Sequence, residues 1–158
     1  MTIKNIALVV VSIVLLSACS KDKKIEKVVY KNDGEWKIKS VSWNQIIQTQ
    51  NGQSITNGTS TDIGTFTFNE NGSGSYYFTI DTNIYQQSFN WSVSDESISV
   101  TKVSQTFDFS GNIKQIAVAF SGTQNSKTEL TIEGSETIQG YTGEVTQRVF
   151  TGTFLLGK

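Results

Sequence analysis

The chain has 158 residues, of which 13 are Lys or Arg and 14 are Asp or Glu, and it contains no His, no Pro and one Cys. This length allows one modest domain, and the balanced charge excludes a nucleic-acid binder that depends on net positive charge. Because His is the side chain that most often transfers protons and ligates metals near neutral pH, its absence argues against an enzyme.

The first 18 residues are typical of a secretory signal peptide. One cation, Lys4, precedes an uncharged apolar run over residues 6–16, which is shorter than the roughly 20 residues of a helix that crosses a bilayer. The tetrad Leu-Ser-Ala-Cys at residues 16–19 resembles the lipobox of bacterial lipoproteins. The resemblance implies that residues 1–18 are removed and that Cys19 becomes an N-terminus carrying a diacylglyceryl group and acyl chains such as palmitate. Two or more acyl chains anchor a protein stably in a membrane.

A lysine-rich segment follows the Cys: residues 20–39 contain seven Lys against four Asp or Glu. We expect residues 19–33 to be the lipidated Cys and a flexible, well-hydrated tether beside anionic headgroups. The Ser-, Thr- and Asn-rich sequence resembles lipoproteins of the Bacteroidota, and Ser20 after the Cys fits release to the outer membrane. The resemblance implies a lipid-anchored outer-membrane protein and leaves open whether it faces the periplasm or the cell surface.

From residue 34 to residue 158, apolar and polar residues alternate in short segments separated by turn residues, which predicts one all-β domain. In chain order we expect strands over residues 36–43, 65–68, 76–80, 85–93, 98–109, 116–120, 130–132 and 145–156. The alternation changes phase after Ile38, which predicts a β-bulge near Ser40. An Asn-Gly pair at residues 71–72 predicts a tight hairpin between the second and third strands, and residues 110–112 predict another.

The connections between these strands are short, so successive strands should pair as antiparallel neighbours. A meander of eight strands removes its unpaired edges by closing, so we expect an eight-stranded antiparallel up-and-down β-barrel. A two-sheet sandwich is the alternative. It would need a long crossover connection, and only residues 48–61 have room for one.

Two features of this domain resemble motifs of a known family. The Gly-Glu-Trp sequence at residues 34–36 resembles the Gly-x-Trp motif of lipocalins, and Arg148, the only Arg of the chain, lies on the last strand. In that family an Arg of the last strand packs across the Trp of the first and closes one end of the barrel. The resemblance therefore implies a lipocalin-like barrel over residues 34–158, closed by Trp36 and Arg148, that binds a small hydrophobic ligand or lipid.

The aromatic residues at inward strand positions have two interpretations. They fill a packed core, or they line a pocket for a hydrophobic small molecule. The residues concerned are Phe66, Phe68, Tyr76, Phe78, Phe89, Trp91, Phe120, Phe150 and Phe154.

The alternative to a ligand carrier is a non-catalytic interaction module that binds an envelope protein or a glycan, or an accessory subunit of an outer-membrane complex. Exposed aromatic and amide side chains, among them Tyr77, Tyr85 and Gln45, would form its surface. We expect no cofactor and no metal, because the chain has no phosphate-binding glycine motif and residues 69–72 lack the acidic positions of a calcium loop.

Overall fold

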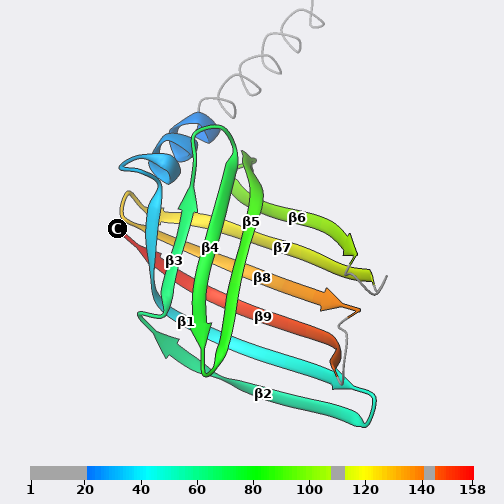
Figure 1. Cartoon of the computed structure of the whole chain (residues 1–158). Helices are drawn as coiled ribbons and strands as arrows, with labels where there is room; N and C mark the ends of the chain where they lie inside the picture. Colours follow the sequence, from blue (N-terminus) through cyan, green and yellow to red (C-terminus); the bar gives the residue numbers. More distant parts are fainter. Residues whose placement is uncertain (1–20, 108–112, 141–144) are drawn as a thin grey trace, which may run out of the picture.

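The computed structural model describes residues 21–107, 113–140 and 145–158, which form nine strands and one helix (Figure 1). The strands are β1 (Glu35–Thr49), β2 (Gly52–Thr61), β3 (Gly64–Phe68), β4 (Ser73–Ile80), β5 (Asn83–Ser94), β6 (Ser97–Phe107), β7 (Ile113–Ser126), β8 (Glu129–Gln139) and β9 (Val145–Gly157). The helix covers residues 21–30. Cys19, the signal peptide over residues 1–18 and the turn expected over residues 110–112 lie outside the described residues.

Eight of these strands form a closed antiparallel barrel. β1 and β3 to β9 pair in chain order, and β9 pairs back with β1, from Lys37 opposite Gly157 to Thr49 opposite Val145. The predicted eight-stranded up-and-down barrel is therefore confirmed, and the two-sheet sandwich is wrong.

β2 is a ninth strand that the sequence does not predict. Residues 48–61 are not a crossover connection: they complete a hairpin in which β1 and β2 form ten residue pairs, from Ser40–Thr61 to Thr49–Gly52. The segment lacks apolar alternation because eight of the ten residues of β2 are exposed. Pairing with β1, and not burial, makes this segment a strand.

Two local predictions are confirmed. The register between β1 and β9 shifts between Ile38 and Ser40, which is the bulge expected near Ser40. β3 and β4 pair antiparallel, and Asn71 Oδ1 in their connection accepts a hydrogen bond of 3.0 Å from the Ser73 amide. Both features depend on residues close in sequence, so local patterns are enough to find them.

The inward side chains of the barrel form one aromatic core. All nine aromatic residues expected at inward positions are buried, and the centroids of neighbouring rings among them lie 5.2 to 6.4 Å apart. Rings at this spacing pack directly against one another. These side chains are buried together in one cluster, which favours the packed-core interpretation. They are Phe66, Phe68, Tyr76, Phe78, Phe89, Trp91, Phe120, Phe150 and Phe154.

The helix lies against the end of the barrel where β1 begins and β9 ends, which we call the closed end (Figure 1). Val29 is fully buried, and its carbonyl accepts a hydrogen bond of 2.7 Å from Trp36 Nε1. At the start of the helix, Lys21 Nζ lies 2.7 Å from Glu96 Oε1. The flexible tether expected over residues 19–33 is therefore wrong for residues 21–30.

Three apolar residues at helical spacing explain why this segment is ordered. Ile25, Val28 and Val29 lie at positions i, i+3 and i+4, so they share one face, and this face packs against the barrel core. Lys23, Lys24 and the other exposed lysines dominate the composition and hide this short pattern. Within the described residues, no helix is long and apolar enough to span a membrane.

Candidate functional site

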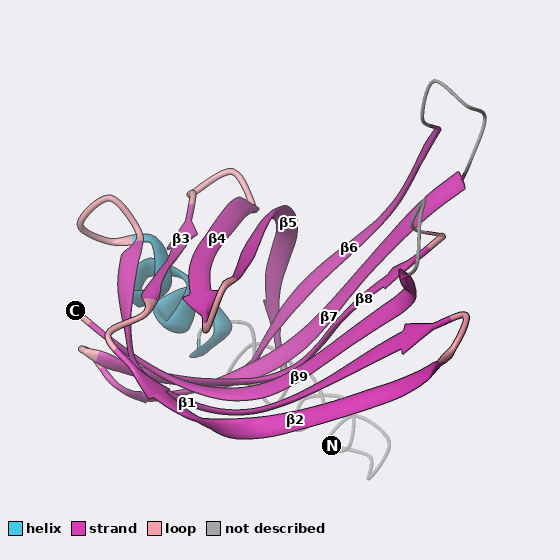
Figure 2. Cartoon of the chain, turned by 60° about the horizontal axis from the view of Figure 1, so that its bottom comes forward, coloured by secondary structure: helices cyan, strands magenta, loops and turns pink. Residues whose placement is uncertain are grey.

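At the end of the barrel opposite the helix the described strands reach different lengths, and we call this end the mouth. Pairing between β5 and β6 stops at Asn90 and Thr101, although β6 continues to Phe107. β3 pairs only with residues 35–37 of β1, although β1 continues to Thr49. Beyond these points β6 to β9, β1 and β2 project as one curved sheet past β3, β4 and β5 (Figure 2). Among the described residues, no strand lies opposite the inner face of this projecting part.

A buried polar cluster lies inside the barrel next to the mouth. It consists of Gln45, Tyr76, Tyr85, Glu136 and Arg148, and we call it the mouth cluster. The Glu136 side chain is 1% exposed and that of Arg148 is 16% exposed, and Arg148 Nη2 lies 3.4 Å from Glu136 Oε1. The Tyr76 hydroxyl donates a hydrogen bond to Glu136 Oε2, and Gln45 Nε2 donates one to the Tyr85 hydroxyl. The Arg148 guanidinium lies 4.7 Å from the centre of the Tyr85 ring.

Burial dominates the titration of the mouth cluster. It raises the pKa of Glu136, although the hydrogen bond from Tyr76 and the charge of Arg148 offset part of this rise. Burial also raises the pKa of Tyr85 to about 12, and burial together with the Glu136 carboxylate raises the pKa of Tyr76. Both tyrosines therefore stay protonated at neutral pH, and Glu136 is the member of the cluster whose charge changes with pH.

Aliphatic side chains lie next to the mouth cluster on the inner face of the sheet. Ile47 and Ile138 lie opposite Arg148 on its two neighbouring strands, and Ile116 lies opposite Ile138 in the same row. Paired residues of antiparallel strands share one face of the sheet. Ile47, Ile116 and Ile138 therefore form an apolar row beside the guanidinium, which we call the mouth shelf; Ile47 is half-buried, and Ile116 and Ile138 are buried.

Further cations lie on the same inner face. Lys102 lies opposite the inward-facing Val118, and its Nζ donates a hydrogen bond of 3.0 Å to Gln87 Oε1. Lys114 is close enough to the mouth cluster to lower the pKa of Glu136. Within the described residues, no group of three Asp, Glu or Cys side chains is placed to hold a metal ion. The inner face at the mouth therefore combines the cations Arg148 and Lys102 and the carboxyl group of Glu136 with aliphatic side chains.

Trp36 and Arg148 do not meet, so the barrel closure implied by the lipocalin resemblance is wrong. Arg148 pairs with Ile47 near the mouth, whereas Trp36 pairs with Phe66 at the closed end. The cation over Trp36 is Lys158, whose Nζ lies 4.5 Å from the ring centre. The alternation of β9 shows that Arg148 faces inward. It does not show which residue of β1 lies opposite Arg148, because that depends on the register between the two strands.

Sequence reasoning missed Glu136, although a signal exists. Glu136 lies two positions before the inward-facing Ile138, so the alternation of β8 places a carboxylate inside the barrel. The expectation that Tyr85 and Gln45 belong to an exposed surface is wrong, since both are buried. Tyr77, by contrast, is 47% exposed.

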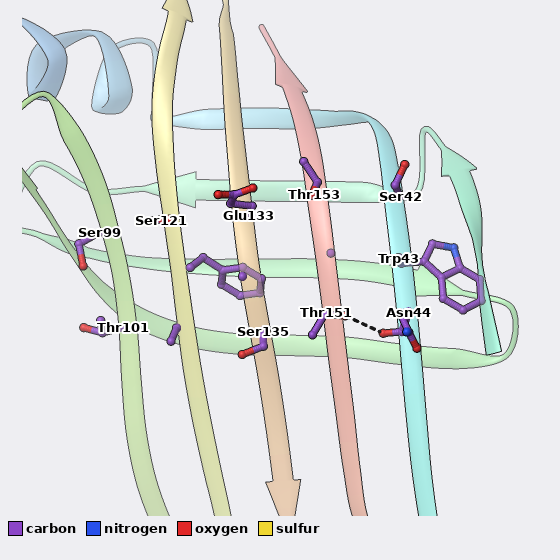
Figure 3. A pocket seen from close by; sticks show the side chains of 14 residues that line it. Ser42, Trp43, Asn44, Ser99, Thr101, Ser121, Glu133, Ser135, Thr151 and Thr153 are labelled. Atoms are coloured by element: carbon purple, nitrogen blue, oxygen red, sulfur yellow. Dashed lines mark hydrogen bonds between the residues drawn. The ribbon is translucent and has the colours of Figure 1, made fainter. Parts of the chain in front are cut away.

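The outer face of the curved sheet carries a shallow groove of about 830 Å³ (Figure 3). Most of its lining side chains are small hydroxyl and amide groups from β1 and β6 to β9, and Gly134 lies opposite Gly152 between them. Glu133 is the one charged residue that lines it. A single exposed carboxylate among hydroxyls provides no acid–base pair, so we interpret this groove as a solvated sheet face.

Six glutamines form an unbroken row across the outer face near the mouth. In the strand order β2, β1, β9, β8, β7 and β6 they are Gln53, Gln48, Gln147, Gln139, Gln115 and Gln105. Ladders of amide side chains stabilise stacked strands, because each amide both donates and accepts hydrogen bonds. The row ends at β2, which has no further strand beside it.

Comparison with known proteins assigns no role to the mouth cluster, the mouth shelf or the glutamine row. No family model matches the sequence, and no curated protein matches it.

Proposed function

We propose that the protein is a membrane-anchored lipoprotein with a lipocalin-like barrel, and that its mouth binds a small anionic amphiphile such as a fatty acid or an acidic lipid. The observation that carries the proposal is the mouth shelf next to the inward cations Arg148 and Lys102. Glu136 pairs with Arg148, whereas the hydrogen-bond partners of Lys102 are the neutral side chains of Gln87 and Ser88. An acidic head group on an aliphatic chain matches both the charge and the apolar surface.

The helix supports a particular orientation of the barrel on the membrane. One residue separates Cys19 from Lys21. Lys21 and Asp22 are held at the closed end by Glu96, through an ion pair of 2.7 Å and a hydrogen bond of 2.9 Å from the Glu96 amide to Asp22 Oδ1. With Cys19 acylated, the closed end faces the bilayer and the mouth opens away from it. A ligand would then enter from the aqueous side.

Ligand binding is tested with the mature chain, residues 19–158, carrying Cys19→Ser so that it needs no detergent. We expect isothermal titration calorimetry to detect binding of oleate, and much weaker binding of uncharged oleyl alcohol. Ile47→Asn, which places an amide on the mouth shelf, should weaken oleate binding roughly tenfold. Ile46→Asn is the matched control, because Ile46 is the next residue on the opposite face of β1 and is also half-buried. No heat with oleate, or equal effects of the two variants, would contradict the proposal.

Association of two copies of the chain through β2 is a second candidate function. Within the described residues β2 pairs with β1 only, so backbone amides and carbonyls along its outer edge have no strand partner there. Natural edge strands usually carry charges, Pro or bulges that block further pairing. The ten residues of β2 include no charge and no Pro, and their register with β1 has no shift. This edge is therefore suited to accept another strand.

A second copy fits this edge because two identical uncharged strands meet without like-charge repulsion. Their amide and hydroxyl side chains are self-complementary, since each group donates and accepts hydrogen bonds. In this dimer the two β2 strands pair antiparallel about a two-fold axis at Ile55, and the outer faces of the two sheets lie on the same side of the dimer. It also places the two Ile55 side chains, each 59% exposed, against each other.

Ile55→Lys should abolish such a dimer, because the two-fold axis would bring two ammonium groups together. Size-exclusion chromatography with light scattering measures the mass of the mature chain over a range of concentrations. Val103→Lys is the control, since Val103 is 89% exposed on the outer face of β6, at the other edge of the projecting sheet. A wild-type chain that stays monomeric, or a dimer that Val103→Lys dissociates equally, contradicts pairing through β2.

A further inference from the structure

A pocket of about 640 Å³ lies at the closed end, between the helix and the barrel. The helix and the loop after it, the connection between β7 and β8, and the last residue of the chain form its walls. The lining residues are Lys27, Val28, Tyr30, Lys31, Asn32, Lys127, Thr128 and Lys158. Because four of the eight are lysines, we call it the lysine pocket.

Cations outnumber acidic side chains at this pocket. None of its lining residues is Asp or Glu, although Glu70 and Glu26 lie close enough to Tyr30 to raise the pKa of its hydroxyl. The two salt bridges within the described residues, Lys21–Glu96 and Arg148–Glu136, involve none of its lysines. Burial lowers the pKa of Lys158, and the nearby charge of Lys31 lowers it further.

Backbone groups hold one of these cations, Lys158, in place. Lys158 Nζ donates a hydrogen bond of 2.9 Å to the Val28 carbonyl and another to the Lys31 carbonyl, and it lies 4.5 Å from the centre of the Trp36 ring. These partners are neutral, so they fix the ammonium group without removing its charge. Lys27, Lys31 and Lys127 are exposed around it and are able to turn toward a ligand.

We propose that the lysine pocket binds a phosphate group, supplied by the headgroup of an anionic lipid in the membrane that carries the protein. Lysine ammonium groups are compact point charges that bind phosphate oxygens well. Val28 and Tyr30 provide apolar wall for the carbon atoms next to the phosphate. The lipid source rests on the proposed acylation of Cys19, which would place the closed end at the bilayer; the anion site itself does not depend on it.

The test measures binding of the mature chain with Cys19→Ser, which has no acyl anchor, to phosphatidylcholine vesicles with and without phosphatidylglycerol. We expect cosedimentation only with phosphatidylglycerol, and a loss of affinity of about tenfold or more for the double variant Lys31→Gln/Lys127→Gln. Lys158 is left unchanged because it also covers Trp36.

The matched control is the double variant Lys23→Gln/Lys24→Gln, which removes the same charge from exposed helix positions that do not line the pocket. It should bind these vesicles nearly as well as the unsubstituted chain. Equal losses for the two double variants would mean that the whole basic surface, and not the pocket, attracts the membrane, and would overturn the proposal.

Two further measurements separate the sources of phosphate and the role of the anchor. Inorganic phosphate that shifts the Thr128 amide signal in NMR, without any vesicle binding, would assign the pocket to a soluble phosphate and overturn the lipid source. Failure of both probes would overturn the site itself. Labelling of the full-length chain in cells with an alkyne palmitate, compared with Cys19→Ser, tests acylation separately, so loss of the anchor and loss of the pocket are distinguishable.

Discussion

Replacing Arg148 by Met is expected to lower the free energy of unfolding of the mature chain by about 3 to 5 kcal/mol near neutral pH. Glu136 then loses its salt-bridge partner, while its side chain stays 1% exposed inside the barrel. Met retains much of the apolar stem of Arg, so the loss reports the unpaired carboxylate more than a cavity. Urea unfolding followed by tryptophan fluorescence measures the change.

The size of this loss should depend on pH with a definite sign. Burial raises the pKa of Glu136 above its ordinary value of 4.5, so the folded chain binds this proton more tightly than the unfolded chain does. A carboxyl group of this kind destabilises the fold progressively as the pH rises from the unfolded pKa through the folded pKa. Without Arg148 the folded pKa rises further. The loss should therefore be large at about pH 8 and much smaller at about pH 5.

Glu136→Gln in the same background serves as the control. The amide oxygen still accepts a hydrogen bond from Tyr76, but it carries no charge. The double variant Arg148→Met/Glu136→Gln should recover part of the lost stability, and this contribution to its pH dependence should vanish. Equal losses for Arg148→Met at both pH values would show that the guanidinium stabilises the barrel by packing alone.

Trp36→Ala is expected to cost about 3 to 5 kcal/mol of unfolding free energy, the usual range for a fully buried Trp. The Trp36 side chain is 0% exposed, and its indole nitrogen donates to the Val29 carbonyl at 2.7 Å. The substitution leaves a cavity, removes this hydrogen bond and takes away the ring beneath the Lys158 ammonium. We therefore also expect the helix to detach, which hydrogen exchange of its amides would detect as lost protection.

Trp43→Ala is the matched control for this substitution. Trp43 lies on the same strand, but it is only half-buried, and its Nε1 donates to Ser60 Oγ of β2 at 3.2 Å. We expect a loss of roughly 1 to 2 kcal/mol and unchanged protection of the helix. A Trp36→Ala chain that melts like the unsubstituted chain, or that keeps a protected helix, would contradict the role assigned to Trp36.

The prediction of a closed barrel succeeded because it used local information. Period-two alternation shows which residues of each strand face inward, and short turns make successive strands neighbours. The bulge near Ser40 and the hairpin between β3 and β4 follow from a few adjacent residues. β2 has no such signal, because neither of its faces is buried and only its pairing with β1 makes it a strand.

The candidate sites show where local information ends. The alternation along β9 shows that Arg148 faces the inside of the barrel. The residue opposite Arg148 depends on the register between β1 and β9, and that residue is Ile47 and not Trp36. Glu136 and Tyr76 are 60 residues apart in sequence, and no spacing rule brings them together. The residues that line the lysine pocket are also far apart in sequence, because they come from the helix, the β7–β8 connection and Lys158.

The amino-acid sequence by itself determined that the domain is all-β and that nine of its aromatic side chains face inward, because these properties depend on neighbours along the chain. Only the tertiary structure decided which inward charges meet, that residues 21–30 form a docked helix, and that β2 is a strand that pairs on one side only among the described residues. These outcomes depend on register and on docking between distant segments, where a shift of a few residues changes every contact.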